Sequence, residues 1–66
     1  MFVSYSVEQG NRRARVIQAA GEYRVEGFTR FTDEVWLKLA VFARTRPLEN
    51  FQNAQHRADD YITTGA

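Results

Sequence analysis

Sixty-six residues, of which 44% are hydrophobic and 14% aromatic, suit one small domain and are too apolar for a disordered segment. The formal net charge of +1 provides no long-range field that would attract nucleic acid or anionic lipid. The lack of cysteine excludes disulfides and thiolate metal sites, and the longest apolar run, residues 39–43, is too short to cross a membrane.

The N-terminal segment predicts a half-buried strand, because apolar and polar residues alternate with a period of two. Val3, Tyr5 and Val7 fall on one face, and Ser4, Ser6 and Glu8 on the other. The pair Gly10-Asn11 then signals a turn. The segment has no basic region, so we expect no signal peptide and a cytoplasmic location.

Residues 12–20 are compatible with a strand or with a helix. A helix would have Asn11 as its N-cap and Gly21 just beyond its end. The arginines at its start would oppose the helix dipole, so a strand with Ala14 and Val16 facing inward is favoured. Residues 22–28 alternate again and predict a third strand, which a tight corner at 20–22 joins to the second.

Residues 32–46 carry the signals of a helix. Thr32 is a candidate N-cap, Asp33 and Glu34 suit the first turn, and Phe31 and Trp36 have the spacing of a hydrophobic staple. Arg44 and Arg46 suit the C-terminal end, and Pro47 stops the run. Trp36 is expected to pack between this helix and the sheet.

A second helix is expected from Pro47 to about Ile62. Its apolar stripe comprises Leu48, Phe51, Gln55, Ala58 and Ile62, flanked by Ala54 and Tyr61, and the last four residues read as a frayed tail. The predicted fold class is α+β. Residues 1–66 form a single small domain, in which a three-stranded antiparallel sheet is followed by two helices packed on one face.

The helix predicted at 32–46 also has apolar residues on the side opposite the face that would pack on the core. Leu37 and Val41 lie one turn apart there, with Arg44 continuing the row, and an aliphatic pair beside an arginine is common at interfaces. These residues are the predicted partner-binding site. Two plainer explanations remain: isolated exposed apolar residues are normal, and the second helix could cover this pair.

An arginine-bearing face of the sheet is the second candidate surface. If the second and third strands form a hairpin, Arg13, Arg15 and Arg24 share its solvent side and could read guanine edges in a DNA major groove. This layout is similar to that of some plant transcription-factor domains and integrase arm-binding domains, although no motif of either occurs in the chain. Glu8, Glu22 and Glu26 share the face and would repel phosphate.

Catalytic chemistry is not indicated. His56 is the single histidine; with Asp59 and Asp60 it forms a helix-surface cluster that lacks a third convergent metal ligand. The glycines do not match phosphate-loop spacing, so neither a cofactor nor a metal is expected.

The sequence therefore predicts a non-catalytic protein-binding module. It would serve as an inhibitor or adaptor of a larger complex, of the kind that phage or mobile elements encode, and its partner would be a foreign protein or a second copy. A DNA-binding domain that reads the duplex with its arginine-bearing sheet is the alternative, and a purely structural subunit is a third possibility. No membrane interaction is expected.

Overall fold

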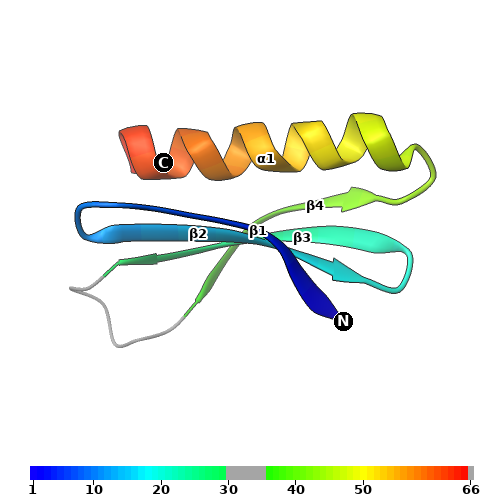
Figure 1. Cartoon of the computed structure of the whole chain (residues 1–66), viewed down its shortest axis with the longest axis horizontal. Coiled ribbons are helices and arrows are strands. Elements are labelled where there is room, and N and C mark those ends of the chain that lie inside the picture. The colour runs from blue at the N-terminus through cyan, green and yellow to red at the C-terminus, as the bar shows by residue number, and fades with distance from the viewer. Residues whose placement is uncertain (30–35, 66) are drawn as a thin grey trace.

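The computed structural model describes residues 1–29 and 36–65. A four-stranded antiparallel sheet is followed by helix α1 (Pro47–Thr64), which lies along one face of the sheet (Figure 1). The strands are β1 (Phe2–Gln9), β2 (Arg12–Ala19), β3 (Glu22–Thr29) and β4 (Leu37–Ala43). They follow one another across the sheet in chain order, so β1 and β4 are the edge strands.

The first three strands and their turns confirm the strands and hairpins predicted from alternation. The face predicted for Val3 is wrong, because the pairing of β1 with β2 shifts between Val3 and Tyr5 and leaves Val3 on the side opposite Tyr5 and Val7. Gln9 pairs with Arg12 and Ala19 pairs with Glu22, so two residues form each connection. Each turn contains a glycine in the left-handed region, Gly10 with φ 61° and Gly21 with φ 75°. Residues with a side chain rarely adopt this conformation, which explains why the chain reverses at these positions.

The prediction of a helix at 32–46 is wrong. Residues Leu37–Ala43 form the edge strand β4, so the described chain has four strands and one helix instead of three strands and two helices. The predicted N-cap, first-turn and staple residues at 31–34 lie outside the described residues. Residues 44–46 connect β4 to α1 instead of ending a helix.

A β-bulge explains why β4 does not alternate in sequence. Val25 of β3 pairs with Ala40, but the next residue, Glu26, pairs with Lys38, so Leu39 is the extra residue in β4. Leu39 and Ala40 both pack against the core, although they are adjacent in the chain. The bulge thus turns a strand pattern into one that resembles the spacing of a helix.

Helix α1 confirms the second predicted helix and extends it to Thr64. Pro47 lies in its first turn, and Gly65 ends it in a left-handed conformation, with its N–H donating to the carbonyl oxygen of Tyr61 at 2.7 Å. The prediction of a frayed tail is therefore wrong for residues 63–65, which complete and cap the helix. Leu48, placed on the predicted apolar stripe, is 82% exposed.

The core lies between α1 and one face of the sheet. It comprises Ala14, Val16, Tyr23 and Val25 from the sheet and Ala54, Ala58, Tyr61 and Ile62 from the helix. Gly27 allows a close approach in this layer, because a Cβ atom there would lie 2.7 Å from Cε2 of Tyr61. The Tyr61 ring therefore occupies the space that a larger residue at position 27 would need.

Candidate partner-binding surface

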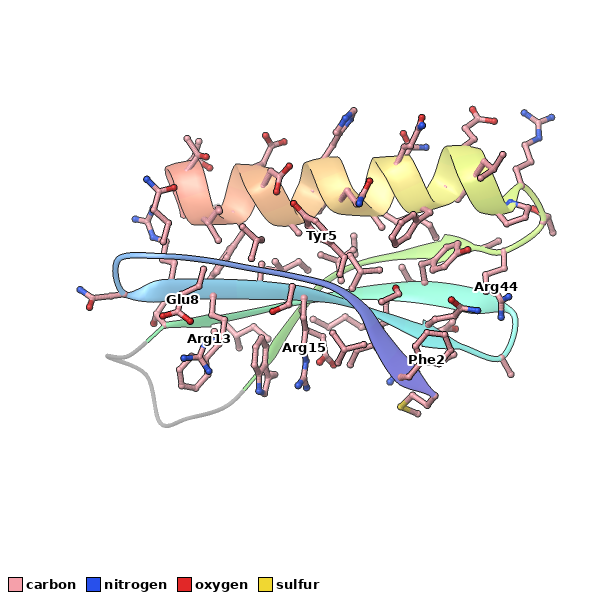
Figure 2. The ribbon with its side chains drawn as sticks, viewed as in Figure 1. Phe2, Tyr5, Glu8, Arg13, Arg15 and Arg44 are labelled. Atoms are coloured by element: carbon pink, nitrogen blue, oxygen red, sulfur yellow. The ribbon has the colours of Figure 1, made fainter. Side chains whose placement is uncertain are left out.

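The sheet face opposite α1 is not covered by any element of the described chain, and we call it the open face. Because residues paired across antiparallel strands point to the same side, the register assigns its members. They are Val3, Ser6 and Glu8 of β1; Arg13, Arg15, Ile17 and Ala19 of β2; Glu22, Arg24, Glu26 and Phe28 of β3; and Lys38, Val41 and Ala43 of β4. Figure 2 shows Arg13 and Arg15 extending away from the helix.

The three arginines proposed to read DNA do lie together on the open face, and each is paired with a glutamate there. Arg13 contacts Glu8 at 3.1 Å, and Arg24 contacts Glu22 at 3.2 Å. The Arg15–Glu26 pair is the tightest, with Nη2 and Oε1 2.7 Å apart and side chains only 27% and 15% exposed. The arginine charges are therefore largely balanced within the face itself.

Two aromatic rings extend this charged network. Phe28 and Trp36 have ring centroids 5.4 Å apart, with the planes tilted by 38°. The Arg15 guanidinium lies over the Trp36 ring, 3.8 Å from its centroid, and Arg13 lies 5.9 Å from the centroid of Phe28. Trp36 is half-buried on this side of the sheet, so the prediction that it packs between a helix and the sheet is wrong.

A row of three aliphatic residues and Arg24 crosses the open face beside the charged pairs. Val3 pairs with Ile17, Ile17 with Arg24, and Arg24 with Val41. Val3 and Val41, on the two edge strands, are 49% and 44% exposed, whereas Ile17 between them is only 7% exposed. The face therefore presents exposed aliphatic groups at both edges.

The structure does not bring the predicted partner residues together. Leu37 pairs with Gly27 and so points to the helix side, whereas Val41 pairs with Arg24 on the open face. Both are about half exposed. Arg44 follows β4 at the end of the sheet that is far from Glu8 (Figure 2).

Arg44 anchors the β2–β3 turn. Its backbone N–H donates to the carbonyl oxygen of Gly21 at 3.0 Å, and its Nη1 donates to that of Ala19 at 3.3 Å. The guanidinium also lies 5.6 Å from the ring centroid of Tyr23. These contacts give Arg44 a structural role within the chain.

On the helix side, Tyr5 joins β1 to α1. Its hydroxyl donates to Oδ1 of Asp59 at 2.8 Å. This hydrogen bond, together with burial and the carboxylate charge, raises the pKa of the Tyr5 hydroxyl above its usual value. Asp59 therefore links α1 to β1, whereas the side chain of His56 is exposed to solvent.

Among the described residues, no group of three or more histidine, cysteine, aspartate or glutamate side chains could hold a metal ion. In the same part of the chain, no helix is long and apolar enough to cross a membrane. Comparison with known proteins gave no matching family model, no curated relative and no similar solved structure.

Sequence reasoning missed the aromatic members of the open face and its aliphatic members other than Val41. Ile17 carried a signal, because alternation places it outward beside Arg13 and Arg15, where a solvated strand would have a polar residue. Val41 was predicted as a partner-binding residue, but on a helix face with Leu37 and Arg44. Its place on the open face, like that of Trp36, depends on residues 37–43 forming a strand.

Proposed function

We propose that this chain is a non-catalytic protein-binding module that contacts its partner through the open face. The observation that carries the proposal is the contrast within that face. Its arginines are paired with Glu8, Glu22 and Glu26, whereas the aliphatic side chains of Val3 and Val41 remain about half exposed. Burial of these aliphatic groups would stabilise a complex with a protein, whereas the paired charges provide little attraction for a phosphate backbone.

The composition of the open face supports a protein as the partner. Arginine and aromatic side chains are enriched at the centres of protein interfaces, where they carry much of the binding energy. Arg15, Trp36 and Phe28 form such a group, already held in place by stacking and by the Glu26 carboxylate. Side chains ordered before binding lose less conformational entropy in the complex.

The pairing of the arginines argues against the DNA alternative. If Arg13, Arg15 and Arg24 contacted phosphate, the glutamates paired with them would also lie close to the DNA backbone and would repel it. A gel-shift assay with duplex DNA at low salt tests this alternative. Retardation that weakens when the three arginines are replaced together would favour DNA binding over the proposal.

The proposal is tested by comparing two glutamate substitutions as baits in a pull-down from the native host. Val41→Glu places a carboxylate in the open face, and Leu48→Glu places one on the exposed start of α1. A protein captured by the wild type and by Leu48→Glu, but lost with Val41→Glu, would support the proposal, because the desolvation of a carboxylate in an apolar interface is strongly unfavourable. Equal capture by a folded Val41→Glu variant would contradict it. We expect the module to act in the cytoplasm.

A further inference from the structure

We infer that the open face binds the open face of a second copy of this chain, giving a two-fold symmetric dimer. This inference rests on the proposed function, because it names the partner of the same surface. An isologous interface requires a surface that is complementary to itself. The register of the sheet determines which residues of the two copies would face each other.

The charged pair at the centre of the face is self-complementary about an axis along the strands. The axis lies between the two stacked sheets, parallel to the strands and midway between β2 and β3. A rotation of 180° about it places β2 opposite β3 of the second copy, and β1 opposite β4 of the second copy. Arg15 and Glu26 are paired across β2 and β3, so each Arg15 would face Glu26 of the other copy. The two ion pairs would form a ring of alternating charge, in which each guanidinium keeps its own carboxylate and gains a second.

The two ends of the row through Val3, Ile17, Arg24 and Val41 match about the same axis. Val3 and Val41 lie at the ends of a row that crosses all four strands, so Val3 would face Val41 of the second copy at both edges of the sheet. The half-exposed valines would then cover each other. Between the valines, each Ile17 would face Arg24 of the second copy and would pack on its aliphatic stem.

The size of the open face is compatible with a specific dimer. The chain measures 35 × 20 × 15 Å along its principal axes. Figure 1 is viewed along the shortest axis with the longest axis horizontal, and the helix is stacked on the sheet along the third axis. The sheet face therefore extends along the longest and shortest axes, 35 Å by 15 Å, or roughly 500 Å² between Cα positions. Side chains enlarge this footprint towards the roughly 800 Å² per partner of ordinary specific interfaces.

Small domains without disulfides often gain stability by association, which adds to the expectation of a dimer. Because stacked sheets cross at about 30°, residues near the centre of the face align best. The charge-reversal test therefore uses Arg15 and Glu26 on the central strands, and a bifunctional reagent bridges Val3 and Val41 at the edges.

The first experiment combines sedimentation velocity with charge reversal. The wild type should approach twice the 7.7 kDa mass of the chain as its concentration rises from micromolar to millimolar. Arg15→Glu and Glu26→Arg should each be monomeric, because their central ring would carry like charges. Mixing the two variants should restore the dimer, since the two substituted side chains would face each other with opposite charges, as would the native Arg15 and Glu26. Arg46→Glu, an equal charge reversal on an exposed residue outside the open face, should leave the dimer unchanged.

A second experiment keeps the inference testable if the charge variants unfold. The chain has no native cysteine, so Val3→Cys with Val41→Cys introduces the only thiols. Within one chain these positions are separated by three strand spacings, about 14 Å, beyond the reach of a short bifunctional thiol reagent. The double variant should form covalent dimers, whereas each single variant should form far fewer, because Val3 would not face Val3.

A monomer at every concentration would overturn the inference, as would a dimer that these variants leave intact. Failure of the dimer does not remove the proposed function. A monomeric chain that loses a foreign partner with Val41→Glu would still be a protein-binding module, while a dimer built on another surface, together with unchanged pull-downs, would refute both.

Discussion

The guanidinium of Arg15 lies 3.8 Å from the centroid of the Trp36 ring, on the sheet face that α1 leaves open. Arg15 also holds the Glu26 carboxylate, so the tryptophan is packed against a paired charge instead of against the hydrophobic core. The fluorescence of Trp36, the single tryptophan of the chain, therefore reports on the environment of the open face.

This position predicts a modest energetic role for Trp36 in the monomer. Trp36→Ala should lower the free energy of unfolding by about 1–2 kcal/mol, because it removes one cation–π contact and one aromatic pair. A residue in the core would lose about 3–5 kcal/mol. Urea unfolding followed by circular dichroism, at a concentration where the chain is monomeric, measures the difference. Acrylamide should quench the tryptophan emission of the folded monomer, and complete protection would contradict the placement.

The close approach of Gly27 to Tyr61 predicts that Gly27→Ala is destabilising. The added methyl group would lie 2.7 Å from the Tyr61 ring and 2.9 Å from Cδ1 of Leu39, so the core must shift. We expect the free energy of unfolding, measured by urea titration, to fall by about 1–3 kcal/mol.

A double-mutant cycle identifies the cause of this effect. Leu39→Ala removes one of the side chains that the new methyl group meets, so the combined variant should lose less stability than the two single variants added together. Strict additivity would show that crowding against Leu39 does not cause the loss at position 27.

The hydrogen bond from Tyr5 to Asp59 predicts an alkaline dependence of stability. Folding stabilises the neutral tyrosine, so its contribution is complete below the unfolded pKa of about 10 and is lost as pH rises through the raised folded pKa. At neutral pH, Tyr5→Phe should cost about 1–2 kcal/mol, since the acceptor is charged. Urea unfolding of both proteins from neutral pH to above pH 10 should show the gap closing. A gap that is constant over this range would refute the coupling.

The contacts of Arg44 predict a larger effect on stability than at the neighbouring arginine. Arg44→Ala should lower the free energy of unfolding by about 1–2 kcal/mol, because it removes the side-chain hydrogen bond to the carbonyl oxygen of Ala19 and uncovers Tyr23. Arg46→Ala is the matched control and should change stability by less than about 0.5 kcal/mol, since its ion pair with Glu49 is exposed to solvent. Thermal unfolding of both variants decides the comparison. Equal effects would mean that Arg44 does not anchor the turn.

The sequence allowed three strands and the C-terminal helix to be predicted because local patterns agreed with the fold there. In β1 and β3, polar residues alternate with Tyr5, Val7, Tyr23 and Val25, and glycines stand where the chain must reverse. In α1, residues three and four apart, from Phe51 to Ile62, face the sheet. These signals are contained within each element.

The edge strand β4 could not be predicted in the same way, because tertiary contacts determine it. Leu, Lys and Ala have good helix propensity, and the bulge at Leu39 removes the alternation by which a strand is recognised. The strand forms since it pairs with β3 and adds Leu39, Ala40 and Phe42 to the surface on which α1 packs. The candidate site depended on this one element, and the open-face group of Val41 and Trp36 became visible only with it.

The meander order of the sheet has a consequence for how the chain folds. Each strand pairs with its neighbour in sequence, and two-residue turns close the first two hairpins, so these pairings form across short loops with little loss of chain entropy. Docking of α1 on β1 instead joins Tyr5 and Asp59 across 54 residues. We therefore expect β2 and β3 to be organised in the folding transition state, and Tyr5→Phe to accelerate unfolding while leaving the folding rate nearly unchanged.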